Sequence, residues 1–143
     1  MIRMILLSWW LSVYSPPTIE TETPLTIRFD NIQTSEGYVL IGIYEKEESW
    51  KKRKPEREIN IPKQLLIENN MIYKVTGMTS GVFGIAALDD ANGNNHVDIG
   101  FIFPTEGFGF SNYYVSGFIL PGFKDFNFSF PLVHEVEIRF RYL

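Results

Sequence analysis

The sequence contains no cysteine, only two histidines and no apolar run of the length that a membrane-spanning helix needs. The missing cysteines exclude disulfide bonds, thiolate metal sites and cysteine nucleophiles. An excess of basic residues is also lacking, since the formal net charge is −4 at pH 7. Because the phosphates of nucleic acids attract strongly basic surfaces, this charge argues against a nucleic-acid partner.

Hydrophobic residues, by contrast, make up 45% and aromatic residues 15% of the 143 residues. This composition and length are typical of one globular domain with a substantial core. A small exported domain without disulfides must draw its stability from packing or from a bound metal.

The chain begins like a secretory signal peptide. Arg3 precedes a short apolar run, which ends at Pro16 and Pro17. We expect residues 1–15 to be a signal peptide, residues 16–24 a flexible leader and residues 25–143 a β-sandwich domain. The protein would then be periplasmic or extracellular, with no membrane-spanning segment after signal removal. The alternatives for the run are a buried first strand and a membrane-tethering stub.

Apolar and polar residues alternate along several short segments, which is the period of a half-buried strand. In the last segment, Val136, Ile138 and Phe140 share one face. Residues 82–88 are nearly continuously apolar, which predicts a central strand buried on both faces. Together these segments predict an all-β fold, a single antiparallel β-sandwich, Ig-like or transthyretin-like, of about seven strands. The strands are expected at residues 25–30, 38–44, 57–61, 71–75, 82–88, 126–130 and 135–141. The charged residues 45–57 are expected to be a solvated connection with a short helical turn.

One loop carries oxygen side chains at the spacing of a calcium site. With Asp90 as position one, side-chain oxygens fall at positions one, three, five and nine, in Asp90, Asn92, Asn94 and Asp98. The main-chain carbonyl of His96 stands at position seven. Position twelve lacks the Glu of an EF-hand, so remaining ligands would come from Asp89, Glu106 or water. Zinc is less favoured, because there is no thiolate and histidine is scarce. The alternative is a polar β-turn, where Asp, Asn and Gly gather for backbone reasons alone.

A glycine- and aromatic-rich stretch follows this loop. Residues 101–130 contain nine Phe and two Tyr, half of the aromatic residues of the chain. These rings either fasten long loops onto the core or form an exposed platform for a ligand such as a sugar ring. The platform hypothesis rests on Phe108, Phe110, Tyr113 and Tyr114.

Several segments resemble the bacterial domain of unknown function 2141. They are Phe-Asp-Asn-Ile at 29–32, Glu-Gly-Tyr-Val-Leu-Ile-Gly-Ile-Tyr at 36–44, Gly-Val-Phe-Gly-Ile-Ala-Ala-Leu-Asp-Asp-Ala-Asn-Gly-Asn at 81–94 with Asp98, and Pro-Thr-Glu-Gly-Phe-Gly-Phe-Ser-Asn at 104–112. The resemblance covers the chain after the leader and implies an exported β-sandwich protein of Gram-negative bacteria with no established activity. This chain has Asn95 where the family commonly has Gly, and Asp89 where it often has His.

These features predict a non-enzymatic envelope or extracellular binding domain with calcium holding the loop. Its partner would be an unidentified small ligand, such as a carbohydrate, or a protein. The alternative is a structural subunit that pairs through exposed strand edges. A hydrolase is less favoured: Ser111 or Ser116 could be paired with a histidine such as His134, but no Gly-x-Ser-x-Gly elbow is present.

Overall fold

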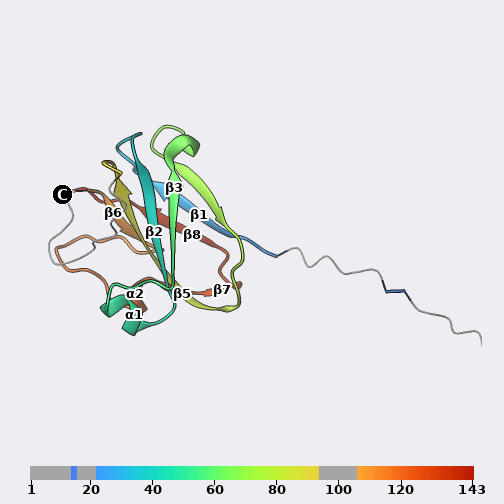
Figure 1. Ribbon diagram of the computed structural model, residues 1–143. Coiled ribbons are helices and arrows are strands. Elements are labelled where there is room, and N and C mark those ends of the chain that lie inside the picture. The colour runs from blue at the N-terminus through green and yellow to red at the C-terminus, as the bar shows by residue number, and fades with distance from the viewer. Residues whose placement is uncertain (1–13, 16–21, 94–105) are drawn as a thin grey trace, which may run out of the picture.

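The computed structural model describes residues 14–15, 22–93 and 106–143 (Figure 1). These residues form the following elements: β1 (Leu25–Asp30), β2 (Tyr38–Tyr44), α1 (Glu47–Lys51), β3 (Arg57–Pro62), the 3-10 helix η1 (Lys63–Leu65), β4 (Met71–Val75), β5 (Gly81–Asp90), β6 (Phe108–Phe110), α2 (Phe123–Phe126), β7 (Asn127–Phe130) and β8 (Glu135–Arg139). Most of the expected signal peptide lies outside the described residues, as do Asn94, His96 and Asp98 of the predicted calcium loop. Among the described residues, no helix is long and apolar enough to cross a membrane.

The strands form two sheets that pack as layers, seen in Figure 1. The three-stranded sheet has the order β4-β1-β8, and the five-stranded sheet has the order β3-β2-β5-β6, with β7 also paired to β5. The predicted all-β sandwich is therefore confirmed. One pairing differs from the antiparallel expectation, because β1 and β8 run parallel, with Ile27 opposite Val136. Parallel neighbours need a long connection, and here almost the whole domain lies between the two strands.

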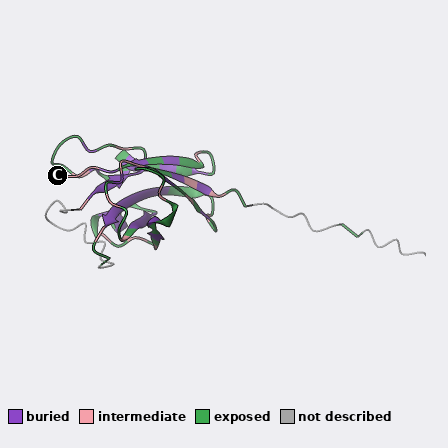
Figure 2. Cartoon of the chain, turned by 90° about the horizontal axis from the view of Figure 1, so that it is seen from above, coloured by how far each residue is buried: buried purple, intermediate pink, exposed green. Residues whose placement is uncertain are grey.

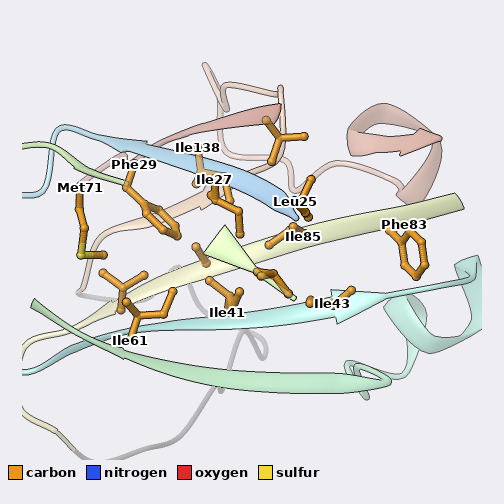
Figure 3. Packing of buried hydrophobic residues seen from close by; sticks show 14 of the residues in the cluster. Leu25, Ile27, Phe29, Ile41, Ile43, Ile61, Met71, Phe83, Ile85 and Ile138 are labelled. Carbon is orange, nitrogen blue, oxygen red and sulfur yellow. The ribbon is translucent and has the colours of Figure 1, made fainter. Parts of the chain in front are cut away.

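The main core lies between the two sheets (Figure 3). Ile27 of β1 and Ile138 of β8 point toward Ile41 of β2 and Ile85 of β5, and each of these side chains is fully buried. Residues that alternate with them along β1 and β8 are exposed or half-buried, so the predicted strand period is confirmed. Burial of this branched aliphatic layer is the main driving force for joining the sheets.

A second core covers the other face of the five-stranded sheet. Leu88 of β5 belongs to it, so β5 is buried on both faces as predicted. Trp50 of α1 closes this core: its ring centroid lies 5.0 Å from that of Phe126, and its indole N–H donates a 2.9 Å hydrogen bond to the carbonyl of Pro121. The helical turn predicted within residues 45–57 is present, and most of the segment is exposed as expected, but Ser49 and Trp50 of α1 are buried.

The two cores leave different burial patterns on the strands. In Figure 2 some strands alternate between buried and exposed residues, whereas others are buried along most of their length. The second kind includes β2, in which every residue after Tyr38 is buried. The rings of residues 101–130 that the structure describes thus have two layers to fill, which explains why so many are accommodated inside one small domain.

Candidate functional site

The predicted calcium loop leaves the sandwich at the end of β5, where Asp90 is completely buried. The main chain of Asp90 packs against Gly37, which lies in the turn before β2 and has a φ of +75°. A Cβ on Gly37 would stand 1.9 Å from the carbonyl oxygen of Asp90, so only glycine fits at this crossing. The first ligand position of the loop is therefore fixed by packing.

The two ends of the loop are joined at its base. The backbone N–H of Asp89 donates a 2.7 Å hydrogen bond to the carbonyl of Gly107. A Cβ on Gly107 would lie 2.4 Å from the ring of Tyr142, which packs directly against the returning chain. The chain thus leaves the sheet at the end of β5 and returns to it at Gly107 at one place.

Asp89 itself is held by a buried ion pair with Lys63, and both side chains are 1% exposed. Nζ of Lys63 contacts Oδ1 of Asp89 and donates two further hydrogen bonds, to Oγ1 of Thr34 at 2.8 Å and to the carbonyl of Glu36 at 2.6 Å. The hydroxyl of Tyr142 donates to the other carboxylate oxygen, Oδ2, at 2.5 Å. Both oxygens of Asp89 are therefore occupied, and its charge is balanced within the protein. This arrangement makes Asp89 a fixed support at the base of the loop, and its assignment as an additional metal ligand stays a prediction.

Tyr142 completes the network by accepting a 2.9 Å hydrogen bond from the backbone N–H of Gln33. Burial of its hydroxyl raises the pKa of Tyr142, and the hydrogen bond to the charged Asp89 raises it further. The phenol stays protonated and so remains a donor to Asp89 at any physiological pH.

Glu106 is the last residue of the loop and lies near Asp90, where the loop begins. Burial raises the pKa of the Glu106 carboxyl, and the negative charge of Asp90 raises it further. The backbone N–H of Asn92 donates to the Glu106 carboxylate and opposes this shift. Negative charge therefore gathers where the loop begins and ends, and a bound cation would relieve the repulsion.

The structure brings together part of the predicted ligand set. Asp90, Asn92 and Glu106 lie near one another at the base of the loop, while Asn94, His96 and Asp98 lie outside the described residues. Within the part of the chain that the structure describes, no group of three or more histidine, aspartate or glutamate side chains is arranged to hold a metal ion. A complete calcium site would thus need ligands from residues 94–105.

The predicted aromatic platform is wrong for two of its four residues. Phe108 and Phe110 are each 1% exposed, because β6 pairs with β5 and turns both rings into the second core. Gly109 between them faces the other way, where a Cβ would lie 2.7 Å from Ile138. The Gly-Phe-Gly-Phe segment is thus a strand with one buried aromatic face.

The other two platform residues lie at the surface. Tyr113 is half-buried and Tyr114 is 52% exposed. With Asn112 and two residues of β8, Glu137 and Arg139, they line an open groove of about 480 Å³. Sequence reasoning missed the two β8 residues as site residues, although the alternation of the last strand had placed both on its outer face.

The candidate hydrolase residues that the structure describes lie in different environments. Ser111 is completely buried: its hydroxyl accepts a 3.0 Å hydrogen bond from the N–H of Ile85 and donates one of 2.6 Å to the carbonyl of Phe126. The hydroxyl thus bridges the backbone of β5 to that of α2. Ser116 and His134 are both exposed.

Comparison with known proteins gives one informative result. No curated protein and no solved structure matches the chain. The family described as "uncharacterized protein conserved in bacteria" (DUF2141) matches residues 27–138, which span β1 to β8. Because this match covers most of the chain and both sheets, the protein belongs to that bacterial family.

Proposed function

We propose that the protein is an exported, non-enzymatic binding domain in which calcium stabilises the loop of residues 90–106. The observation that carries this proposal is the placement of Asp90 and Glu106 at the two ends of that loop, where burial and then the negative charge of Asp90 raise the pKa of Glu106. Lys63 offsets only part of this charge, because its ammonium group is paired with the carboxylate of Asp89. A cation held by the loop would offset more of it.

Calcium suits these ligands better than other metals. Carboxylate, amide and main-chain oxygens are hard ligands, and calcium accepts six to eight of them in a flexible geometry. The spacing of Asp90, Asn92, Asn94 and Asp98, with the carbonyl of His96, provides such oxygens in sequence order. In this proposal the ion orders a surface loop and takes part in no reaction.

The placement of the polar residues supports a role without catalysis. Ser111 is buried and its hydroxyl is hydrogen-bonded to two backbone groups, so it is not accessible as a nucleophile. Export, to the periplasm or beyond, is supported by the basic and apolar start of the sequence.

A second candidate is a subunit that pairs through strand edges. It is favoured by the position of β4 at the edge of its sheet, next to exposed apolar side chains: Leu65 at 52%, Ile67 at 78% and Ile72 at 49% exposure. Light scattering during size-exclusion chromatography separates this candidate from a monomeric binding domain. A stable dimer that Ile72→Lys dissociates would favour the subunit.

Isothermal titration calorimetry tests the calcium proposal directly. Calcium titrated into chelator-treated protein should bind with a dissociation constant on the order of 10⁻⁴–10⁻³ M, the range of extracellular modules. Asp90→Asn should weaken binding, whereas Asp125→Asn in α2 should leave it unchanged. Absence of calcium binding to the wild type at millimolar concentration would overturn the proposal. Mass spectrometry of the protein from its native cell tests export, which predicts loss of the first residues.

A further inference from the structure

The groove beside β8 is built on a fixed turn. The backbone N–H of Asn112 donates a 2.8 Å hydrogen bond to the carbonyl of Glu137, and the N–H of Glu137 donates a 2.9 Å hydrogen bond to Oδ1 of Asn112. Asn112 has a φ of 52°, a left-handed conformation that asparagine tolerates better than most residues. The side chains of Tyr113 and Tyr114 therefore extend from a backbone that the edge of β8 already holds in place.

Contacts with the second core also fix the turn. Val115 is buried in the second core, and its carbonyl accepts a hydrogen bond from the guanidinium of Arg141. The Tyr113 N–H bonds to the carbonyl of Phe110, which belongs to the same core. A ligand that enters this groove would meet a surface that needs little ordering on binding, and this lowers the entropic cost of association.

The groove combines an aromatic face with both signs of charge. The guanidinium of Arg139 lies 5.5 Å from the centre of the Tyr114 ring and 3.6 Å from the carboxylate of Asp30. The carboxylate of Glu137 has no hydrogen bond or ion pair with any residue that the structure describes. Two charges of opposite sign therefore line the groove, and the carboxylate of Asp30 lies beside the positive one.

We propose that this groove binds a neutral saccharide. An anion would meet the carboxylate of Glu137, and a cation would meet the guanidinium of Arg139, so neither sign of charge is favoured. A sugar ring offers an apolar face to the Tyr114 ring, and its hydroxyls accept from Arg139 and donate to Glu137. The groove volume of about 480 Å³ falls within the usual range of small-molecule sites. The inference rests on the proposed function only in naming the ligand of a binding domain, and it makes no use of the calcium loop.

The test is a chemical-shift titration of ¹⁵N-labelled protein with three neutral tetrasaccharides: cellotetraose, chitotetraose and maltotetraose. At least one should shift the amide signals of Asn112, Tyr113, Tyr114, Glu137 and Arg139 at millimolar concentration. Tyr114→Ala should weaken this binding about tenfold, and Tyr114→Phe, which keeps the ring, should retain most of it. Phe118→Ala is the matched control, because it removes an exposed aromatic side chain that does not line the groove.

The proposal is overturned if no tetrasaccharide shifts the groove signals, or if Tyr114→Ala binds like the wild type while its spectrum shows an intact fold. Binding of a tetragalacturonate in place of the neutral sugars would equally overturn it, since that ligand is an anion. A calcium titration of the same sample separates this inference from the proposed function. Calcium should shift signals of Asp90, Asn92 and Glu106, so shifts there without any sugar response would reject the saccharide site alone.

Discussion

The hydroxyl of Tyr142 donates a hydrogen bond to Oδ2 of Asp89, 2.5 Å away, and so joins the C-terminal end of the chain to the base of the loop at residues 90–106. Lys63 holds the other oxygen of the same carboxylate. Three distant parts of the sequence thus meet at one buried charge, directly beside the residue from which the predicted calcium loop starts.

Removal of the Lys63 ammonium group from this network should destabilise the folded protein. Lys63→Met leaves the carboxylate of Asp89 buried without its partner, and we expect a loss of about 3–5 kcal/mol in the free energy of unfolding. The double variant Lys63→Met/Asp89→Leu should recover most of this loss, because it removes both charges. Urea denaturation measures both values. Lys52→Met is the control: its pair with Glu48 is exposed, so the loss should stay below about 1 kcal/mol.

Tyr142→Phe should destabilise the protein less than Lys63→Met does. The substitution keeps the ring against Gly107 but removes the hydrogen bonds with Asp89 and with the N–H of Gln33. We expect a loss of about 1–3 kcal/mol in urea denaturation. A variant as stable as the wild type would show that water replaces the hydroxyl at no cost.

Phe128 tests the buried aromatic face of β7. Its side chain is 6% exposed within the main core, so Phe128→Ala should lower the free energy of unfolding by about 3–5 kcal/mol. Leu132→Ala, at a side chain that is 85% exposed, should change it by no more than about 0.5 kcal/mol. Similar losses in the two variants would contradict the packing described for β7.

Tyr44 gives a prediction about alkaline pH. Its hydroxyl is buried without a hydrogen-bond partner among the described residues, and burial raises the pKa of Tyr44 to about 12 from 10.0. Because the folded state holds this proton more tightly than the unfolded state, the associated stability is fully present below pH 10 and is lost as the pH rises through about 12. Between pH 8 and pH 11 the wild type should lose about 1 kcal/mol more than Tyr44→Phe, which has no such proton. Equal losses in urea denaturation at the two pH values would contradict the assignment.

The fold was largely predictable from strand periodicity, and its pairing was not. Alternation along β8 depends only on which residues face the core, so Val136 and Ile138 show it in the sequence itself. The parallel contact of β8 with β1 depends on how the remaining chain packs, and no local pattern encodes it. Trp50 was missed for a related reason: one buried ring among charged neighbours produces no period.

The candidate sites were predictable only in part. The spacing of oxygen residues predicts a calcium loop, and this remains a prediction, since most of residues 90–106 lie outside the described residues. A lone lysine gives no signal of burial, so the Lys63–Asp89 pair could not be foreseen. The platform alternative for Phe110 depended on the glycines around it, which suggest a loop, whereas Gly109 allows β6 to approach β8 closely.

Thermal unfolding with calcium and with chelator tests the central claim most directly. At a calcium concentration tenfold above the expected dissociation constant, binding to the folded state alone contributes about 1.4 kcal/mol. The wild type should therefore melt a few degrees higher with calcium than with chelator, and magnesium should do less, because it loses its water reluctantly. Asp90→Ala should abolish the difference, while Asp125→Asn should retain it. Identical midpoints for the wild type in millimolar calcium and in chelator would contradict the account, and the loop would then be only a polar turn.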